Sequence, residues 1–133
     1  MKTESLLDSF ALLKFFQQES GFEKVRHRLS EAKQHQKPLL MCELNVGEVF
    51  YVIGKRHGIA QAESILAQLP TLPLHLIPAT WDIALQAARL KAQYALSYAD
   101  CITAACAISH RATLMTGDKE FKALEHLLPI EWV

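Results

Sequence analysis

The sequence has no long hydrophobic run and little that would direct it across a membrane. Its opening, MKTESLLDSF, has no apolar stretch behind a basic start, so it does not predict a signal peptide. No segment approaches the roughly 18 apolar residues of a membrane-spanning helix. Only three cysteines occur, with no CxxC pair and no zinc spacing to a histidine. We interpret them as small core residues and predict a cytoplasmic protein.

An excess of charge of one sign is also missing. The chain has 14 Lys and Arg residues and 14 Asp and Glu residues, so its formal net charge is zero. Proteins that coat nucleic acid by bulk charge are usually strongly basic, and this balance excludes that class. It leaves open an enzyme that meets a phosphate backbone through a local patch or a metal ion.

Linkers, repeats and low-complexity tracts are absent, and 133 residues suit a single domain. Short apolar strands alternate with helical patterns along the chain. We predict strands at 5–7, 39–42, 74–77, 113–115 and 130–133, helices at 9–18, 21–36, 43–57, 59–69, 80–94 and 99–110, and a short turn at 119–124. This alternation predicts an α/β domain with a mostly parallel sheet, in which ligands bind beyond the carboxyl ends of the strands.

Aspartate is scarce in this chain, which has only Asp8, Asp82, Asp100 and Asp118. Asp8 directly follows the first strand, and Asp118 comes shortly after the fourth. Asp100 and Asp82 lie near the starts of predicted helices. Aspartate is favoured at helix N-caps and in first turns, and we keep that simple explanation for Asp82.

A further acid, Glu48, lies inside a predicted helix, within the apolar stretch LNVGEVFYVI. Capping does not explain an acid at this place, and a buried carboxylate either becomes neutral or finds a positive partner. Glu48 is therefore a protonated buried acid, the partner of a distant lysine, or a ligand of a metal shared with the strand-end aspartates. Two carboxylates about 4 Å apart repel by about 4 kcal/mol at an effective dielectric near 20. Several acids in one cleft thus favour a divalent cation, and oxygen ligands alone select magnesium or manganese.

Four motifs that contain these acids resemble the PIN-domain family, in particular the VapC-type ribonuclease toxins of toxin–antitoxin pairs. They are LLDSFALL with Asp8, CELNVGEV with Asn45 and Glu48, LSYADCITAACAI with Asp100, and LMTGDKEF with Asp118. The first motif alone is common in α/β proteins, whereas the last two are fairly specific in order and spacing. The resemblance runs from about residue 5 to residue 133.

The resemblance implies a three-layer α/β/α sandwich with a central, mostly parallel sheet, formed by residues 1–133 as one PIN-like nuclease domain. It implies a metal-dependent endoribonuclease that hydrolyses RNA phosphodiester bonds. Asp8 and Asp100 would be the main metal ligands, with Mg²⁺ or Mn²⁺ as the cofactor. Asp118 would complete the metal site or position the attacking water, and Glu48 would hold the metal directly or through water.

Neighbouring residues and partners follow from the same resemblance. Thr116 and Ser9 would hydrogen-bond the carboxylates or the substrate, whereas Glu120 fits a solvated surface better than an outer acid of the site. The partners would be the RNA substrate, a cognate antitoxin and a second copy in a homodimer.

Two questions stay open at this stage. The same residues would serve a stand-alone RNA-processing nuclease, whereas a silent PIN-fold binding module is disfavoured because all four acids are present. A phosphate binder of the response-regulator kind fits poorly, because Asp8 has no acidic neighbour after its strand. The basic stretch KVRHRLSEAKQHQK, residues 24–37, is either a solvated helix face or a track for the RNA backbone, and Lys14 is a second candidate for such a contact.

Overall fold

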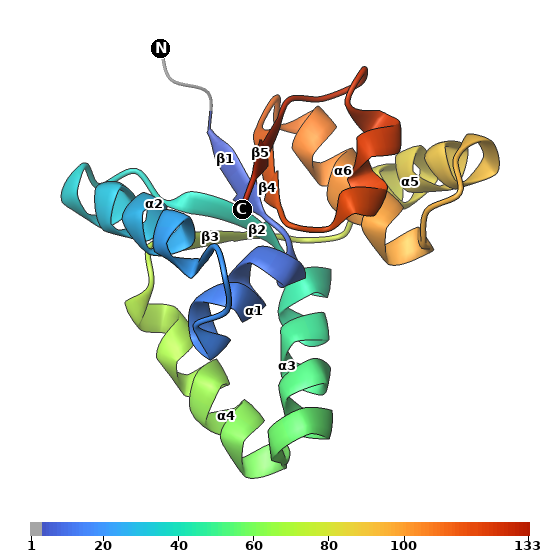
Figure 1. Ribbon diagram of the computed structural model, residues 1–133. Coiled ribbons are helices and arrows are strands. Elements are labelled where there is room, and N and C mark those ends of the chain that lie inside the picture. The colour runs from blue at the N-terminus through green and yellow to red at the C-terminus, as the bar shows by residue number, and fades with distance from the viewer. Residues whose placement is uncertain (1–3) are drawn as a thin grey trace.

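A five-stranded sheet lies at the centre of the computed structural model, which describes residues 4–133 (Figure 1). The strands are β1 (Ser5–Leu7), β2 (Leu39–Cys42), β3 (Leu74–Ile77), β4 (Thr113–Thr116) and β5 (Ile130–Trp132). Their order is β3-β2-β1-β4-β5, and all of these neighbours pair in parallel. The predicted parallel sheet is thus confirmed.

Six helices connect the strands and cover both faces of the sheet (Figure 1). They are α1 (Ser9–Gln17), α2 (Phe22–Gln34), α3 (Glu43–His57), α4 (Ile59–Gln68), α5 (Trp81–Gln93) and α6 (Tyr98–Ser109). The first four helices pack against one face and the last two against the other. The three-layer α/β/α sandwich is confirmed, and the predicted boundaries are correct to within two residues.

The strands divide the hydrophobic core into two halves. In β1, Leu6 packs with the core residues of α5 and α6, whereas Leu7 packs with those of α1 to α4. Both side chains have no exposed surface. Successive side chains of a strand point to opposite faces, so a short strand with two leucines supplies both layers.

Helix α6 is buried along most of its length, in the run Cys101–Ala107. Its small side chains allow it to lie close to both the sheet and α5. The three cysteines are free and buried, as their interpretation as core residues requires. Although α6 is apolar, no helix within residues 4–133 is long and apolar enough to cross a membrane.

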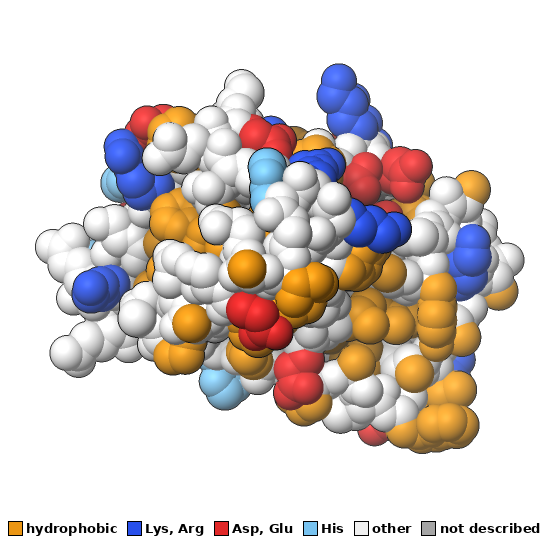
Figure 2. Space-filling model, turned by 90° about the horizontal axis from the view of Figure 1, so that it is seen from below, with side chains coloured by type: hydrophobic (Ala, Val, Ile, Leu, Met, Phe, Trp, Pro, Cys, Tyr) orange, Lys and Arg blue, Asp and Glu red, His pale blue; other side chains and the backbone are white. Residues whose placement is uncertain are grey.

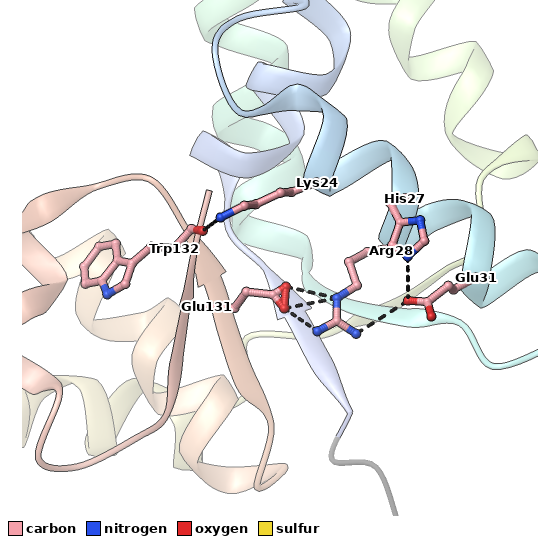
Figure 3. A network of polar contacts seen from close by, with 6 residues as sticks. All are labelled: Lys24, His27, Arg28, Glu31, Glu131 and Trp132. Atoms are coloured by element: carbon pink, nitrogen blue, oxygen red, sulfur yellow. Dashed lines mark hydrogen bonds and ion pairs between the residues drawn. The ribbon is translucent and has the colours of Figure 1, made fainter.

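The basic stretch of α2 docks this helix beside β5 (Figure 3). The Arg28 guanidinium binds both carboxylate oxygens of Glu131, and Lys24 Nζ donates to the Trp132 carbonyl at 3.2 Å. Arg26 pairs with Glu23 on the surface of the same helix. Much of the charge on α2 is therefore used within the protein, which favours the interpretation of this stretch as a solvated and docking face over an RNA track.

The Arg28–Glu131 pair is expected to stabilise the fold measurably. Replacing Arg28 by Met should lower the free energy of unfolding by about 1–2 kcal/mol, because Glu131 loses a charged double hydrogen bond at a half-buried site. Arg26→Met is the matched control, since it breaks an exposed pair and should cost less than about 0.5 kcal/mol. Urea denaturation of both variants measures the difference. Equal losses would mean that the contact between α2 and β5 adds no more than a surface pair.

Candidate active site

The chain changes direction within the sheet between β1 and β4. From β1 it passes to β2 and β3 on one side, and it returns through α5 and α6 to β4 on the other side. At such a switch point the connections leave in opposite directions and open a crevice beyond the carboxyl ends of the two strands. Asp8 follows β1 and Asp118 follows β4, so the fold places both aspartates at this switch point.

Asp8 is 4% exposed and is fixed by two hydrogen bonds. Its Oδ1 accepts from the Ala11 amide at 2.8 Å, which caps α1, and its Oδ2 accepts from the Thr116 hydroxyl. Burial raises the pKa of Asp8 to about 7, against the lowering effect of the two hydrogen bonds. The negative charges of Asp100 and Asp118 raise it further. One carboxylate thus caps a helix and also faces other acids, and the predicted bond from Thr116 to a carboxylate is confirmed.

Carboxylate oxygens of Asp100, Asp118 and Glu120 all lie within 4.8 Å of one another. Asp100 lies in the first turn of α6, which Ser97 caps, and Asp118 caps the short 3₁₀ turn Lys119–Leu124 by accepting from the Glu120 amide at 3.0 Å. Burial raises the pKa of Asp100 to about 6, and the charges of Asp118, Glu48 and Glu120 raise it as well, against a hydrogen bond with Ser97. Glu120 is exposed, as the sequence suggested, and it also belongs to this acidic group.

Glu48 lies beside this group on α3, outside the tight set of three acids. The expectation that it is enclosed in an apolar helix is wrong, because Glu48 is half-buried and Tyr51, one turn further along, is 51% exposed. Val49 and Ile53 fill the core side of α3, which leaves the side with Glu48 and Tyr51 facing outward. The Asn45 amide donates to Glu48 Oε1 at 2.7 Å.

A buried polar pair, Asn45 and Thr103, joins α3 to α6 behind the acids. Thr103 Oγ1 lies 3.0 Å from the Asn45 amide nitrogen and 3.1 Å from the Asn45 amide oxygen, and both residues are 1% exposed. Because the same amide nitrogen holds Glu48, this contact fixes Glu48 relative to Asp100. Thr103 is not among the site residues predicted from the sequence. Its position three residues after Asp100, on the same helical face, was the available clue.

The chemistry of these side chains suits a hard divalent cation. Within residues 4–133, none of the five acids Asp8, Glu48, Asp100, Asp118 and Glu120 forms an ion pair with a Lys or Arg. Burial, and after it the charges of neighbouring acids, raise the pKa values of Asp8 and Asp100. Carboxylate oxygens without His or Cys favour magnesium or manganese, so the residues present fit such an ion.

Thr103 offers a test of this arrangement. Thr103→Val keeps the shape of the side chain but removes the hydroxyl that orients Asn45, so the affinity for Mn²⁺ should fall about 10-fold, as for other residues that orient metal ligands. Thr103→Ser retains the hydroxyl and should bind Mn²⁺ nearly as well as the unchanged protein. Calorimetric titration with Mn²⁺ gives both affinities. If Thr103→Val has a lower melting temperature but an unchanged affinity for Mn²⁺, the hydroxyl contributes to stability alone.

Comparison with known proteins identifies the family. The family model of the PIN domain matches residues 5–127. The chain belongs to the PIN-domain family. Among curated proteins, none matches it. The predicted family is thereby confirmed, and the arrangement of strands and acids described above is the form that this chain gives to a PIN domain.

Solved structures show the same fold in proteins of toxin–antitoxin systems. A toxin–antitoxin complex from Klebsiella pneumoniae matches with 25% identity and a TM-score of 0.63, over 89% of this chain and 90% of that one. VapBC2 from Rickettsia felis, bound to a promoter DNA fragment, has 18% identity and a TM-score of 0.76, over 97% and 98%. VapC20 from Mycobacterium tuberculosis, a toxin that cleaves the sarcin-ricin loop, has 16% identity and a TM-score of 0.69, over 90% and 94%.

The structure brings the four predicted acids near one another at one end of the sheet. Asp100 and Asp118 lie in the tight acidic group, and Asp8 and Glu48 lie near enough for charges to act between them and this group. Asp82 lies on α5, whose cap is Thr80, as its simple explanation required. The roles of the four acids as metal ligands stay a prediction.

Proposed function

We propose that this PIN domain, residues 1–133, is a metal-dependent endoribonuclease that hydrolyses RNA phosphodiester bonds in the cytoplasm. The observation that carries the proposal is the gathering of carboxylates from β1, α3, α6 and the end of β4 at the switch point of the sheet. Within this family, four of these acids occupy the expected motifs. A silent binding module would have no use for so many unpaired carboxylates in one crevice.

Asp8, Glu48, Asp100 and Asp118 would hold a Mg²⁺ or Mn²⁺ ion, with Glu120 as a further ligand suggested by its distance to Asp100 and Asp118. When bound, the ion would neutralise the charge that builds on the phosphate and lower the pKa of water at the site. Thr116 would keep the Asp8 carboxylate in place, and Asn45 would do the same for Glu48. Asp118 would complete the site or orient the water that attacks the phosphate.

We also propose that the protein is the toxin of a toxin–antitoxin pair, silenced by a cognate antitoxin, and that it forms a homodimer. The support is its membership of the PIN family together with the toxin–antitoxin proteins that share its fold, VapBC2 among them. A stand-alone RNA-processing nuclease with the same chemistry is the alternative. Growth arrest on expression of the protein, relieved by expression of a gene adjacent to its own, would favour the toxin, and unaffected growth would favour the alternative.

A cleavage assay tests the nuclease itself. The purified protein is incubated with a panel of cellular RNAs that includes tRNA and ribosomal RNA, in Mn²⁺, in Mg²⁺ and in EDTA. We expect discrete cleavage products in at least one metal and none in EDTA. Cleavage that persists in EDTA would contradict the metal-dependent mechanism. Inactivity on every RNA of the panel, in both metals, would contradict the proposed ribonuclease activity.

A further inference from the structure

The face of the molecule that Figure 2 shows carries no continuous basic surface. Its Lys and Arg side chains are scattered. Several charges of α2 are bound to Glu131, to the Trp132 carbonyl and to Glu23. If RNA reaches the acids, it needs contacts of another kind near them.

Most of the exposed aromatic residues within residues 4–133 lie close in sequence to the acids instead. Among residues 4–133, four aromatic residues are exposed: Phe10, Tyr51, Trp81 and Tyr98. Three of them lie within three residues of a site acid, since Phe10 follows Asp8, Tyr51 follows Glu48 and Tyr98 precedes Asp100. The Tyr98 hydroxyl is already bound to the Ala84 carbonyl at 3.0 Å. Phe10 and Tyr51 are the two that have no such structural bond among the described contacts.

Phe10 and Lys14 form a ring–cation pair on α1, next to Asp118. The Phe10 ring is 40% exposed, and Lys14 Nζ lies 5.4 Å from its centroid. Lys14 Nζ also donates to the Ser20 carbonyl at 2.7 Å, which holds the ammonium near the ring while two of its three N–H donors remain for a phosphate. A Cβ atom placed on Gly117, the residue before Asp118, would lie only 2.8 Å from Phe10 Cε1 and 2.7 Å from Lys14 Cε. The missing side chain of Gly117 is therefore what allows this pair to lie against the acidic loop.

Tyr51 and Lys55 form a second pair of the same kind on α3. Tyr51 lies one turn beyond Glu48, on the outward side of the helix, and Lys55 Nζ is 5.6 Å from its ring centroid. Helices α1 and α3 pack against each other, and each begins at the carboxyl end of a strand beside the acids. The two pairs thus extend from the acidic group along two neighbouring helices.

We propose that single-stranded RNA crosses the acidic group on these two pairs, with one base stacked on Phe10 and another on Tyr51 and with Lys14 and Lys55 at adjacent phosphates. Aromatic rings beside cations bind single strands in this way, because every unpaired base offers a face for stacking. A duplex hides those faces, so the arrangement selects unpaired RNA. The proposal rests on the proposed function and adds the residues along which the RNA would lie.

Binding of a short, fluorescein-labelled, single-stranded oligoribonucleotide tests the path. Anisotropy is measured with Mn²⁺ in an Asp100→Asn background, which prevents cleavage, over a series of salt concentrations. Phe10→Leu and Tyr51→Leu should each weaken binding about 5- to 100-fold without changing the salt dependence. Lys14→Gln and Lys55→Gln should each reduce the slope of log affinity against log salt by about 0.7. The duplex of the same sequence should bind more weakly than the single strand.

The chain offers a matched control in Phe22 and Arg26, a ring–cation pair on α2 with Arg26 Cζ 5.7 Å from the ring centroid. Phe22→Leu should leave RNA affinity unchanged, as should Lys33→Gln, an exposed lysine on the same helix. Unchanged binding by Phe10→Leu and Tyr51→Leu, or an equal loss in Phe22→Leu, would overturn the proposal. In the cleaving protein the two ring variants should raise KM while kcat changes little.

A second copy of the chain is the alternative ligand for the surface that carries Phe10 and Tyr51. Hydrophobic side chains that could contact a second copy are also visible on the right of Figure 2, over the half that holds α5 and α6. Light scattering of Tyr51→Leu separates the two. If this variant turns a dimer into monomers that bind RNA with full affinity, Tyr51 serves the dimer and the RNA path is wrong. The binding assay does not need cleavage. Loss of RNA binding in the ring variants would therefore support the path even if the wild type cleaved no RNA. Absence of cleavage would contradict only the proposed nuclease activity.

Discussion

Asp100→Asn is expected to lower the rate of RNA cleavage at least about 100-fold, the size of effect that follows loss of one preorganised electrostatic group. Asp100 is the acid whose pKa is raised by the largest number of neighbouring acids. Its pKa is raised to about 6 by burial and by the charges of three neighbouring acids. The asparagine keeps the shape of the side chain but removes the negative charge that would hold a divalent ion. Initial rates with a single purified RNA in Mn²⁺ measure the loss.

Asp82→Asn is the matched control for this prediction. Asp82 also lies in the first turn of a helix, with Thr80 as the cap, but it is exposed and lies outside the acidic group. Asp82→Asn removes a charge that favours the helix dipole, so it should lower stability by a few tenths of a kcal/mol, about 0.5 at most. Asp100→Asn removes a charge that burial and the neighbouring acids disfavour, so it should not lower the stability of the metal-free protein at neutral pH. Only Asp100→Asn should affect cleavage. Full activity of Asp100→Asn would mean that the acidic group is not the catalytic centre.

The fold was accessible from the sequence because local patterns and topology agree. Four-residue strands such as LLMC, bounded by helical periodicity, have few other arrangements than a parallel sheet with crossover helices. The same logic predicts that Asp8 and Asp118 lie at one edge of the sheet, since the carboxyl ends of parallel strands meet there. Glu48 and Asp100 needed the family motifs as well, because periodicity alone does not say which helix faces the crevice.

Other features of the site depend on contacts that no local pattern contains. The bond between Asn45 and Thr103 joins residues that are 58 positions apart. Glu120 looked like an ordinary surface acid until the 3₁₀ turn after Asp118 brought it to Asp100. The docking role of Arg28 depended on Glu131, on the last strand. In each case a polar side chain gained its function from the packing of distant elements.

Asp8 carries the second large prediction, which concerns stability. This carboxylate is buried, and its pKa of about 7 lies well above its ordinary value of 3.8. Between these two values the folded, metal-free protein holds a proton at Asp8 that the unfolded chain has released. The folded state thus binds more protons, and its stability must fall as the pH rises through this window. The raised pKa of Asp100 acts in the same direction.

Asp8→Asn should therefore stabilise the metal-free protein at pH 8 by about 2–4 kcal/mol, because the asparagine avoids the cost of a buried charge. Its side-chain oxygen still accepts from the Ala11 amide, and asparagine is a good N-cap, so α1 keeps its start. The gain should disappear below pH 4, where Asp8 is protonated in both the folded and the unfolded state. Thermal melts in EDTA across this pH range measure it, with Asp82→Asn as the exposed control.

Bound metal should reverse the stability difference between Asp8→Asn and the wild type at pH 8. This reversal would link the stability of the protein to its function. A ligand that binds only the folded state stabilises it by an amount that grows with the logarithm of ligand concentration over Kd. Mn²⁺ should therefore raise the melting temperature of the wild type at pH 8 and that of Asp8→Asn much less. The same variant should have lost RNA cleavage. A stabilised but inactive protein would show that the fold tolerates an unfavourable carboxylate because the ion requires it. If Asp8→Asn were instead less stable than the wild type at pH 8 in EDTA, the Asp8 carboxylate would be a structural cap first, and its burial would need no ion to explain it.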